Sequence, residues 1–173
     1  MWYKYLIIFL LFWLFAIVQS SFLPYFSISP NLVFALFFLL IFFEAKGEYN
    51  LGIWIALMAG FFLDALSVSY FGISIISLIA VYFVEKAISH FLKDAEGKQP
   101  VFYFLPIFLA CFLAFELLLY LLSFLFKYQA SFELNSITII NVIFNLIFAI
   151  AGFYIYKVFI KGRRSEKQLK LFR

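Results

Sequence analysis

Charged residues are scarce in this sequence, and their scarcity decides the solvent in which the chain folds. Only 13% of the 173 residues are Asp, Glu, Lys or Arg, whereas 67% are apolar and the mean hydropathy is +1.09. A soluble globule of this size needs far more polar surface than such a chain can supply. The composition therefore excludes an ordinary soluble domain and predicts a membrane protein.

Cysteine and histidine are scarcer still, with one residue of each. A single cysteine, Cys111, cannot form an internal disulfide, and the sequence has no CxxC, HExxH or phosphate-binding loop pattern. We therefore expect no metal and no cofactor, and we predict that the protein is not an enzyme. The net charge of +4 comes from basic residues that flank apolar segments, so it does not indicate binding to nucleic acid.

Long apolar runs make up most of the chain. A helix needs about 20 apolar residues to cross a hydrocarbon core of about 30 Å, and lipid admits only helices or closed barrels as spanning structures. Runs such as LIIFLLFWLFAIV lack the alternation of barrel strands. We predict an all-α polytopic bundle of six transmembrane segments, at 2–20, 30–45, 51–66, 72–91, 101–126 and 137–160.

The second and third of these segments are short. Sixteen residues rise roughly 24 Å, so the pair forms either two true spans or a hairpin that enters the membrane and returns. Both choices leave the two termini on one side. We expect the first segment to be a span rather than a cleaved signal peptide, because it is too aromatic and its Val18-Gln19-Ser20 end is a poor cleavage site.

The basic residues indicate which side that is. If the N-terminus is cytoplasmic, twelve of the thirteen lysines and arginines fall inside and only Lys127 falls outside, which agrees with the positive-inside rule. We predict a transmembrane bundle over 1–160, with both termini cytoplasmic, and a basic cytoplasmic tail over 161–173. The tail is either a topology anchor or a contact for anionic lipid or a cytoplasmic partner.

The third segment carries a stripe of small residues that ends in an acid. Gly52, Ala56, Gly60 and Asp64 recur at every fourth position and so share one helix face. Small side chains let membrane helices approach closely, so we predict that Asp64 faces protein. An ionised, unpaired carboxylate in lipid costs about 2.5 kcal/mol or more.

Two amides on the sixth segment are candidate partners for this acid. Asn141 and Asn145 lie one turn apart and, like Asp64, in the outer half of the membrane. We predict a polar cluster of Asp64, Asn141 and Asn145. The alternative is that Asp64 caps a turn at the interface while each amide bonds a neighbouring helix.

A second acid, Glu116, lies near the middle of the fifth segment. That segment has its own small stripe, Pro106, Ala110 and Ala114, which we expect to pack inward. Glu116 lies about 200° around the helix from Ala114. Because an acid that faces lipid is disfavoured, we expect either another helix of this chain or a partner protein to cover it.

One part of the sequence resembles a known family. The stretch LPYFSISPNLVF (23–34), a short charged loop with Gly47, and GIWIALMAGFFLDALSVSYFGISIISLIAVYFV (52–84) resemble MreD, the rod shape-determining membrane proteins of bacteria. The positions that carry the resemblance are Pro30, Asn31, Gly52, Gly60, Asp64 and Gly72. Length, segment count and cytoplasmic termini fit along the whole chain, whereas the second half matches in hydropathy alone.

This resemblance implies a non-enzymatic component of the bacterial cytoplasmic (inner) membrane. MreD proteins belong to the elongasome, which directs lateral cell-wall synthesis and cell shape, and MreC is the expected partner. MreB, and RodA with its transpeptidase partner, are further implied partners, and self-association stays open. The resemblance makes Pro30, Asn31 and Asp64 structural residues, and it makes the small stripes and Glu116 contact surfaces.

A different class of protein shares this architecture. The substrate-binding S-components of ECF vitamin transporters are also six-helix proteins of this size, with a ligand pocket near the outer face, where the predicted polar cluster would lie. S-components typically carry an A-x-x-x-A step on the first helix, whereas Ala16 is followed here by Ser20, beside the bulky Trp13. We therefore expect the MreD-like role and keep vitamin binding as the alternative.

Overall fold

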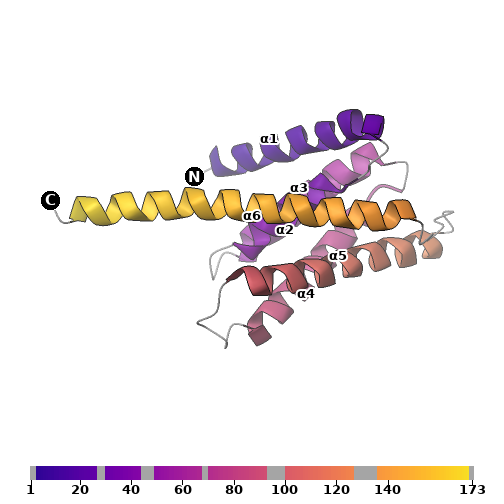
Figure 1. Ribbon diagram of the computed structural model, residues 1–173. Coiled ribbons are helices and arrows are strands. Elements are labelled where there is room, and N and C mark those ends of the chain that lie inside the picture. Colours follow the sequence, from indigo (N-terminus) through magenta and orange to yellow (C-terminus); the bar gives the residue numbers. More distant parts are fainter. Residues whose placement is uncertain are drawn as a thin grey trace.

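The computed structural model describes residues 3–26, 30–43, 49–67, 70–92, 100–126 and 136–171. All regular structure in these ranges is helical, as the sequence predicts. The helices are α1 (Tyr3–Ile17), α2 (Leu32–Phe42), α3 (Tyr49–Leu66), α4 (Ile73–Leu92), α5 (Pro100–Leu125) and α6 (Ser136–Leu171). A short π-helix, η1 (Val18–Phe22), and a 3-10 turn, η2 (Leu23–Phe26), follow α1. The helices form one bundle, and both ends of the chain lie toward the same side of it (Figure 1).

Within the described ranges, three helices are long and apolar enough to cross a membrane. The apolar stretch Tyr5–Tyr25 lies in α1, η1 and η2, Tyr103–Leu125 lies in α5, and Ile140–Val158 lies in α6. Leu32–Phe42 and Leu51–Leu66 are shorter apolar helices. Helices of this length and composition indicate a protein that is embedded in a membrane.

The shortest of the six α-helices, α2, is the most deeply buried. Its 11 residues rise about 16 Å, roughly half of a hydrocarbon core. Seven of the 11 side chains are buried, because α2 packs against α1, α3, α5 and α6. Within the predicted segment at 30–45, the structure therefore has a short internal helix, Leu32–Phe42.

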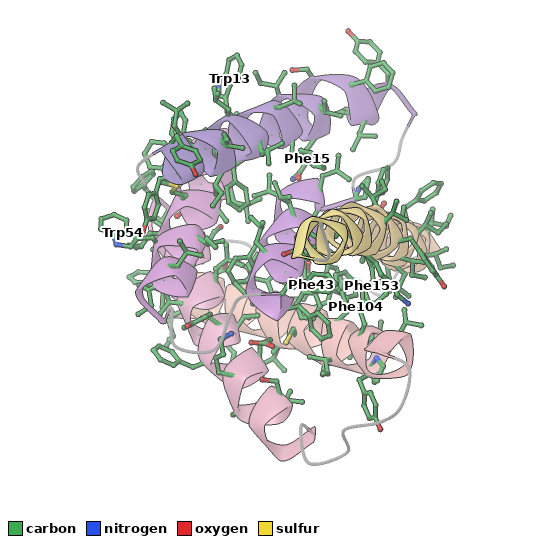
Figure 2. All side chains as sticks on the ribbon, turned by 90° about the vertical axis from the view of Figure 1, so that its left-hand side faces the viewer. Trp13, Phe15, Phe43, Trp54, Phe104 and Phe153 are labelled. Atoms are coloured by element: carbon green, nitrogen blue, oxygen red, sulfur yellow. The ribbon has the colours of Figure 1, made fainter. Side chains whose placement is uncertain are left out.

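Phenylalanine fills the interface between α2 and α5. Three rings on each helix meet in antiparallel order: Phe34 with Phe112, Phe38 with Phe108 and Phe42 with Phe104. The ring centroids are 5.1 to 5.4 Å apart and the planes are inclined by 76 to 89°, which is the edge-to-face arrangement that aromatic pairs prefer. The ring of Phe104 also contacts Phe153 of α6 (Figure 2), so one aromatic core joins three helices.

The packed face of α5 is therefore aromatic, and the predicted inward stripe of small residues on this helix is wrong. Phe104 and Phe108 are almost completely buried, whereas Pro106 and Ala110 are exposed and Ala114 is half-buried. A phenylalanine ring buries much more apolar surface than alanine does, and its contacts with other rings add further stabilisation. These contacts decide which face of α5 turns inward.

Glycine permits the close approach of α3 and α4. A Cβ atom on Gly60 would lie 2.5 Å from the Cα and 2.8 Å from the backbone nitrogen of Ile75, so the two backbones touch at this level. Ala56 is completely buried, and Gly52 faces the ring of Tyr82 on α4. The small stripe on α3 faces protein, as its spacing predicts.

Helix α6 continues without interruption from Ser136 to Leu171. Its apolar stretch ends at Val158, and the remainder projects beyond the other helices (Figure 1). The basic segment predicted as a separate tail over 161–173 is thus, as far as Leu171, a continuation of the last helix.

Candidate functional site

Asp64, in the last turn of α3, caps the start of α4. Its carboxylate accepts hydrogen bonds from the backbone nitrogens of Gly72 (2.8 Å), Ser74 (2.9 Å) and Ile75 (3.4 Å). The first amides of a helix have no partner within that helix, and the positive end of the helix dipole favours a negative group. Asp64 is only 4% exposed and its bond to Ser74 is buried, so it satisfies this donor where water has little access.

The turn between α3 and α4 depends on glycine. Gly72 has a φ of +105°, a backbone conformation that residues with a side chain rarely adopt. Ser67, at the other end of the turn, donates both its backbone nitrogen and its hydroxyl to the carbonyl oxygen of Asp64. Asp64 and Gly72 together fix how the chain reverses between the two helices.

The predicted cluster of Asp64 with Asn141 and Asn145 does not form. Among the described residues, the Asp64 carboxylate accepts its hydrogen bonds from backbone nitrogens at the start of α4, as in the alternative in which Asp64 caps a turn. The short turn after α3 holds these donors beside the acid, whereas α6, which carries the two amides, packs against α2 and α5. Asn145 is 2% exposed, and its Oδ1 has no hydrogen-bond partner in the described part of the chain.

Side chains from three parts of the chain cap the central helix α2. At its start, Oδ1 of Asn31 accepts from the nitrogen of Phe34 (2.9 Å), and Oε1 of Gln19 in η1 accepts from the nitrogen of Val33 (3.1 Å). At its end, Nζ of Lys86 on α4 donates to the carbonyl oxygen of Ile41 (3.3 Å). The end groups of a helix have no partner within that helix, and a bilayer core supplies no water for them, so these side chains stabilise α2.

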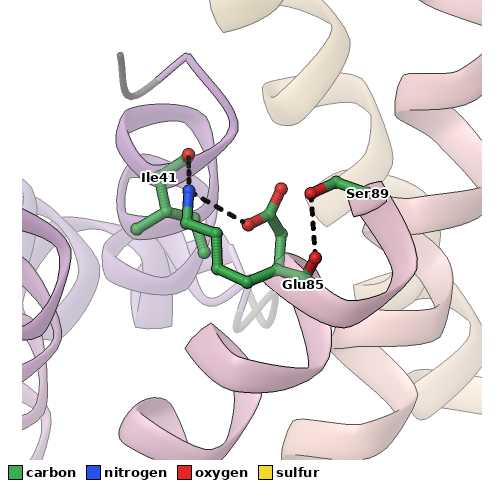
Figure 3. Close-up of polar contacts among 4 residues, drawn as sticks. Ile41, Glu85 and Ser89 are labelled. Atoms are coloured by element: carbon green, nitrogen blue, oxygen red, sulfur yellow. Dashed lines mark hydrogen bonds and ion pairs between the residues drawn. The ribbon is translucent and has the colours of Figure 1, made fainter. Parts of the chain in front are cut away.

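Sequence reasoning missed the polar group formed by Glu85 and Lys86. Glu85 is 2% exposed, and its Oε2 lies 3.5 Å from Nζ of Lys86 (Figure 3). The Lys86 ammonium also lies 5.3 Å from the ring centroid of Tyr82. The sequence assigned Lys86 only to the cytoplasmic surface, whereas its side chain is 22% exposed and takes part in packing. Glu85 and Lys86 lie inside the predicted segment 72–91, and charged residues within an apolar segment are the signal that could have found this group.

Glu116 lies within the apolar stretch of α5 and is half-buried. Within the described ranges, no hydrogen bond or ion pair reaches its carboxyl group. The neighbouring Leu113 and Leu117 are 63% and 57% exposed. Other helices of this chain therefore cover Glu116 only in part.

The described residues offer little that could hold a metal or an organic cofactor. They contain no group of three or more His, Cys, Asp and Glu side chains that could hold a metal ion. A cavity of about 210 Å³ lies between α1 and α3, lined by Phe9, Trp54, Leu57, Met58, Phe61 and Phe62. Specific small-molecule sites place a few polar groups among apolar ones, and this lining is apolar throughout.

Comparisons with known proteins assign no family. No protein-family model matches the chain, and neither the curated proteins nor the solved structures contain a match.

Proposed function

We propose that this chain is a non-enzymatic, multi-pass protein of the bacterial cytoplasmic membrane that acts as MreD-type proteins do. In this role it binds an MreC-type protein and helps to direct lateral cell-wall synthesis and cell shape. The strongest support for this proposal comes from the residues that carry the resemblance to MreD, because they have structural roles in the bundle. Asn31, Gly60, Asp64 and Gly72 shape and join helices, and none of them lines the described cavity.

The arrangement of polar side chains supports an assembly role. Asp64 caps α4, while Asn31, Gln19 and Lys86 cap α2, so these polar groups stabilise the frame itself. Much of the outer surface is apolar, with large side chains such as Trp13 and Trp54 about half exposed. A stable frame with apolar outer faces fits a protein that packs against helices of other membrane proteins.

In the proposed topology both termini are cytoplasmic and the six helices all contribute to the membrane domain. The 18 residues of α3 and the 20 residues of α4 rise about 27 and 30 Å, close to the thickness of a hydrocarbon core. The distribution of lysine and arginine favours this orientation. Labelling of single cysteines placed at positions 46 and 127, with Cys111 replaced by serine, tests it, because only position 127 should react from outside.

The vitamin-binding alternative has less support. The polar cluster that would open an outer pocket does not form, because the carboxylate of Asp64 is used by the backbone of α4. Ala16 is 1% exposed, so it packs inside the bundle. It therefore cannot form part of an A-x-x-x-A docking motif on the outer surface of α1.

Purification of the tagged full-length chain from its native membrane in a mild detergent tests the proposal. We expect an MreC-type single-span protein in comparable amount, and rounded cells when the chain is depleted. Recovery of an ATPase together with a coupling subunit would overturn the proposal, and so would thermal stabilisation by a vitamin at low micromolar concentration.

A further inference from the structure

Glu116 differs from the other described carboxylates within the bundle. Asp64 receives three backbone hydrogen bonds, and Glu85 pairs with Lys86. No comparable donor within the described ranges reaches Glu116. The described residues therefore provide a polar partner for Asp64 and for Glu85, but none for Glu116.

The depth of Glu116 makes this difference important. It is the fourteenth of the 23 residues in the apolar stretch Tyr103–Leu125, about 20 Å from one end and about 14 Å from the other. An acid at this depth is strongly disfavoured against lipid, and such residues usually face protein or mark a functional site.

The exposed side of α5 next to Glu116 has the spacing of a helix-packing seam. Leu113, Leu117, Tyr120 and Phe124 follow one another at steps of four, three and four residues, and they are 63%, 57%, 38% and 70% exposed. This is the a/d spacing with which two helices pack side by side, and residues that flank such a seam pair across it. Lipid alone could cover the apolar side chains of Leu113, Leu117 and Phe124, but Glu116 at the edge of the seam needs a polar group.

We propose that this face of α5 binds the transmembrane helix of a single-span partner protein, and that this helix places a hydrogen-bond donor opposite Glu116. The donor belongs to a Ser, Thr, Asn or Gln side chain, or to a basic one. Charge and hydrogen-bond complementarity to the carboxyl group select this occupant over lipid. The inference rests on the proposed function, in which the partner is an MreC-type protein, and it names the surface where that protein docks.

Reconstitution of the full-length chain with the full-length MreC-type protein in phosphatidylethanolamine/phosphatidylglycerol vesicles provides the test. Association is followed by energy transfer between dyes on the extramembrane parts of the two proteins. We expect Glu116→Leu to raise the dissociation constant of the complex about tenfold, the change expected when one hydrogen bond between membrane helices is lost. Leu117→Trp should weaken it as much by blocking the seam, whereas Ile147→Trp, at a 53% exposed position of α6, should leave it unchanged.

Glu116→Gln identifies the donor. If Gln binds within about threefold of the wild type, the donor is a neutral side chain; if it binds as weakly as Leu, the donor is basic, because a charged pair is lost. Thermal midpoints in detergent serve as the folding control. Should Glu116→Leu fold poorly, Leu117→Trp and Leu113→Trp test the same surface.

The outcomes separate this inference from the proposed function. If the wild-type chain does not associate with the MreC-type protein, both fail. If it associates but Glu116→Leu and Leu117→Trp bind as the wild type does, only the docking surface is wrong. If the two variants abolish association between copies of this chain and leave the MreC-type protein bound, the occupant is a second copy and the inference is overturned.

Discussion

Replacement of Asp64 tests the physical basis of the α3–α4 turn. In Asp64→Leu, the amides of Gly72 and Ser74, which lie 2.8 and 2.9 Å from the carboxylate, lose their acceptor. The Ser74 bond is buried, so its donor costs about 1–3 kcal/mol when it has no partner. The Gly72 amide is only partly buried and adds a smaller cost. The 3.4 Å contact with Ile75 is too long to add much, and the lost negative charge at the helix start adds about 0.3–1 kcal/mol.

Asp64→Asn should be intermediate. The two carboxylate oxygens accept from different donors: Oδ1 accepts from Ser74, and Oδ2 accepts from Gly72 and Ile75. Asparagine has one oxygen, so it satisfies one side of the turn and presents its NH₂ group to the donor on the other. We expect a loss of about 1–3 kcal/mol, the cost of one unsatisfied donor, with the fold retained.

Two measurements check this order of stability. Unfolding of the wild type, both variants and the control Ala65→Asn, at an exposed position beside Asp64, should rank the wild type and the control above Asn and Asn above Leu. Hydrogen exchange over residues 70–76 should accelerate in Asp64→Leu, because its amides lose their acceptor. If Asp64→Leu is as stable as Ala65→Asn and its amides exchange no faster, the capping role of Asp64 is refuted.

Three further predictions concern packing and polar contacts, each measured as the change in unfolding free energy in detergent. Gly60→Ala should destabilise the protein by about 1–3 kcal/mol, because the added methyl group meets the backbone of α4. Gly152→Ala should destabilise it less, because its methyl group meets only the end of a leucine side chain. Equal losses of stability in the two variants would contradict this explanation. Lys86→Met should destabilise the protein by about 2 kcal/mol, which is less than the 3–5 kcal/mol for breaking a fully buried ion pair, because Lys86 is 22% exposed. Adding Glu85→Gln should recover part of this loss. Strictly additive losses in the double variant would exclude coupling between the two side chains. Asn145→Leu should be neutral or stabilising by up to about 1 kcal/mol, because it removes a buried oxygen without a partner in the described ranges, and a clear loss of stability would show that this amide has a structural role.

The sequence predicted the helical class and the inward face of α3 because both depend on local patterns. Gly52, Ala56 and Gly60 repeat at a helical period, and the structure packs them against the neighbouring helix. The inward face of α5 was predicted wrongly, because small residues and phenylalanines both recur there at helical spacing. Only the ring partners on α2, supplied by Phe34 and Phe38, decide between the two faces, and no local pattern contains that information.

The polar contacts could be predicted only where the partners are close in sequence. Asn31 and Asp64 bond to amides three to eleven residues later. Lys86 instead bonds to Ile41, 45 residues earlier, and Gln19 bonds to Val33 from a different helix. Such contacts follow from how the helices pack, so a single sequence could suggest the buried acid at position 64 but could not identify Gln19 and Lys86 as caps of α2.

Because α6 is one unbroken rod, it can act as a lever. The part beyond Val158 adds 13 residues, about 20 Å of helix, to a stretch held inside the bundle at Ala149 and Phe153. A change of about 10° in the tilt of the held part, well within the range seen for membrane helices, moves the far end by about 3.5 Å. Rearrangement among helices in the bilayer would thus become displacement outside it, with no hinge required.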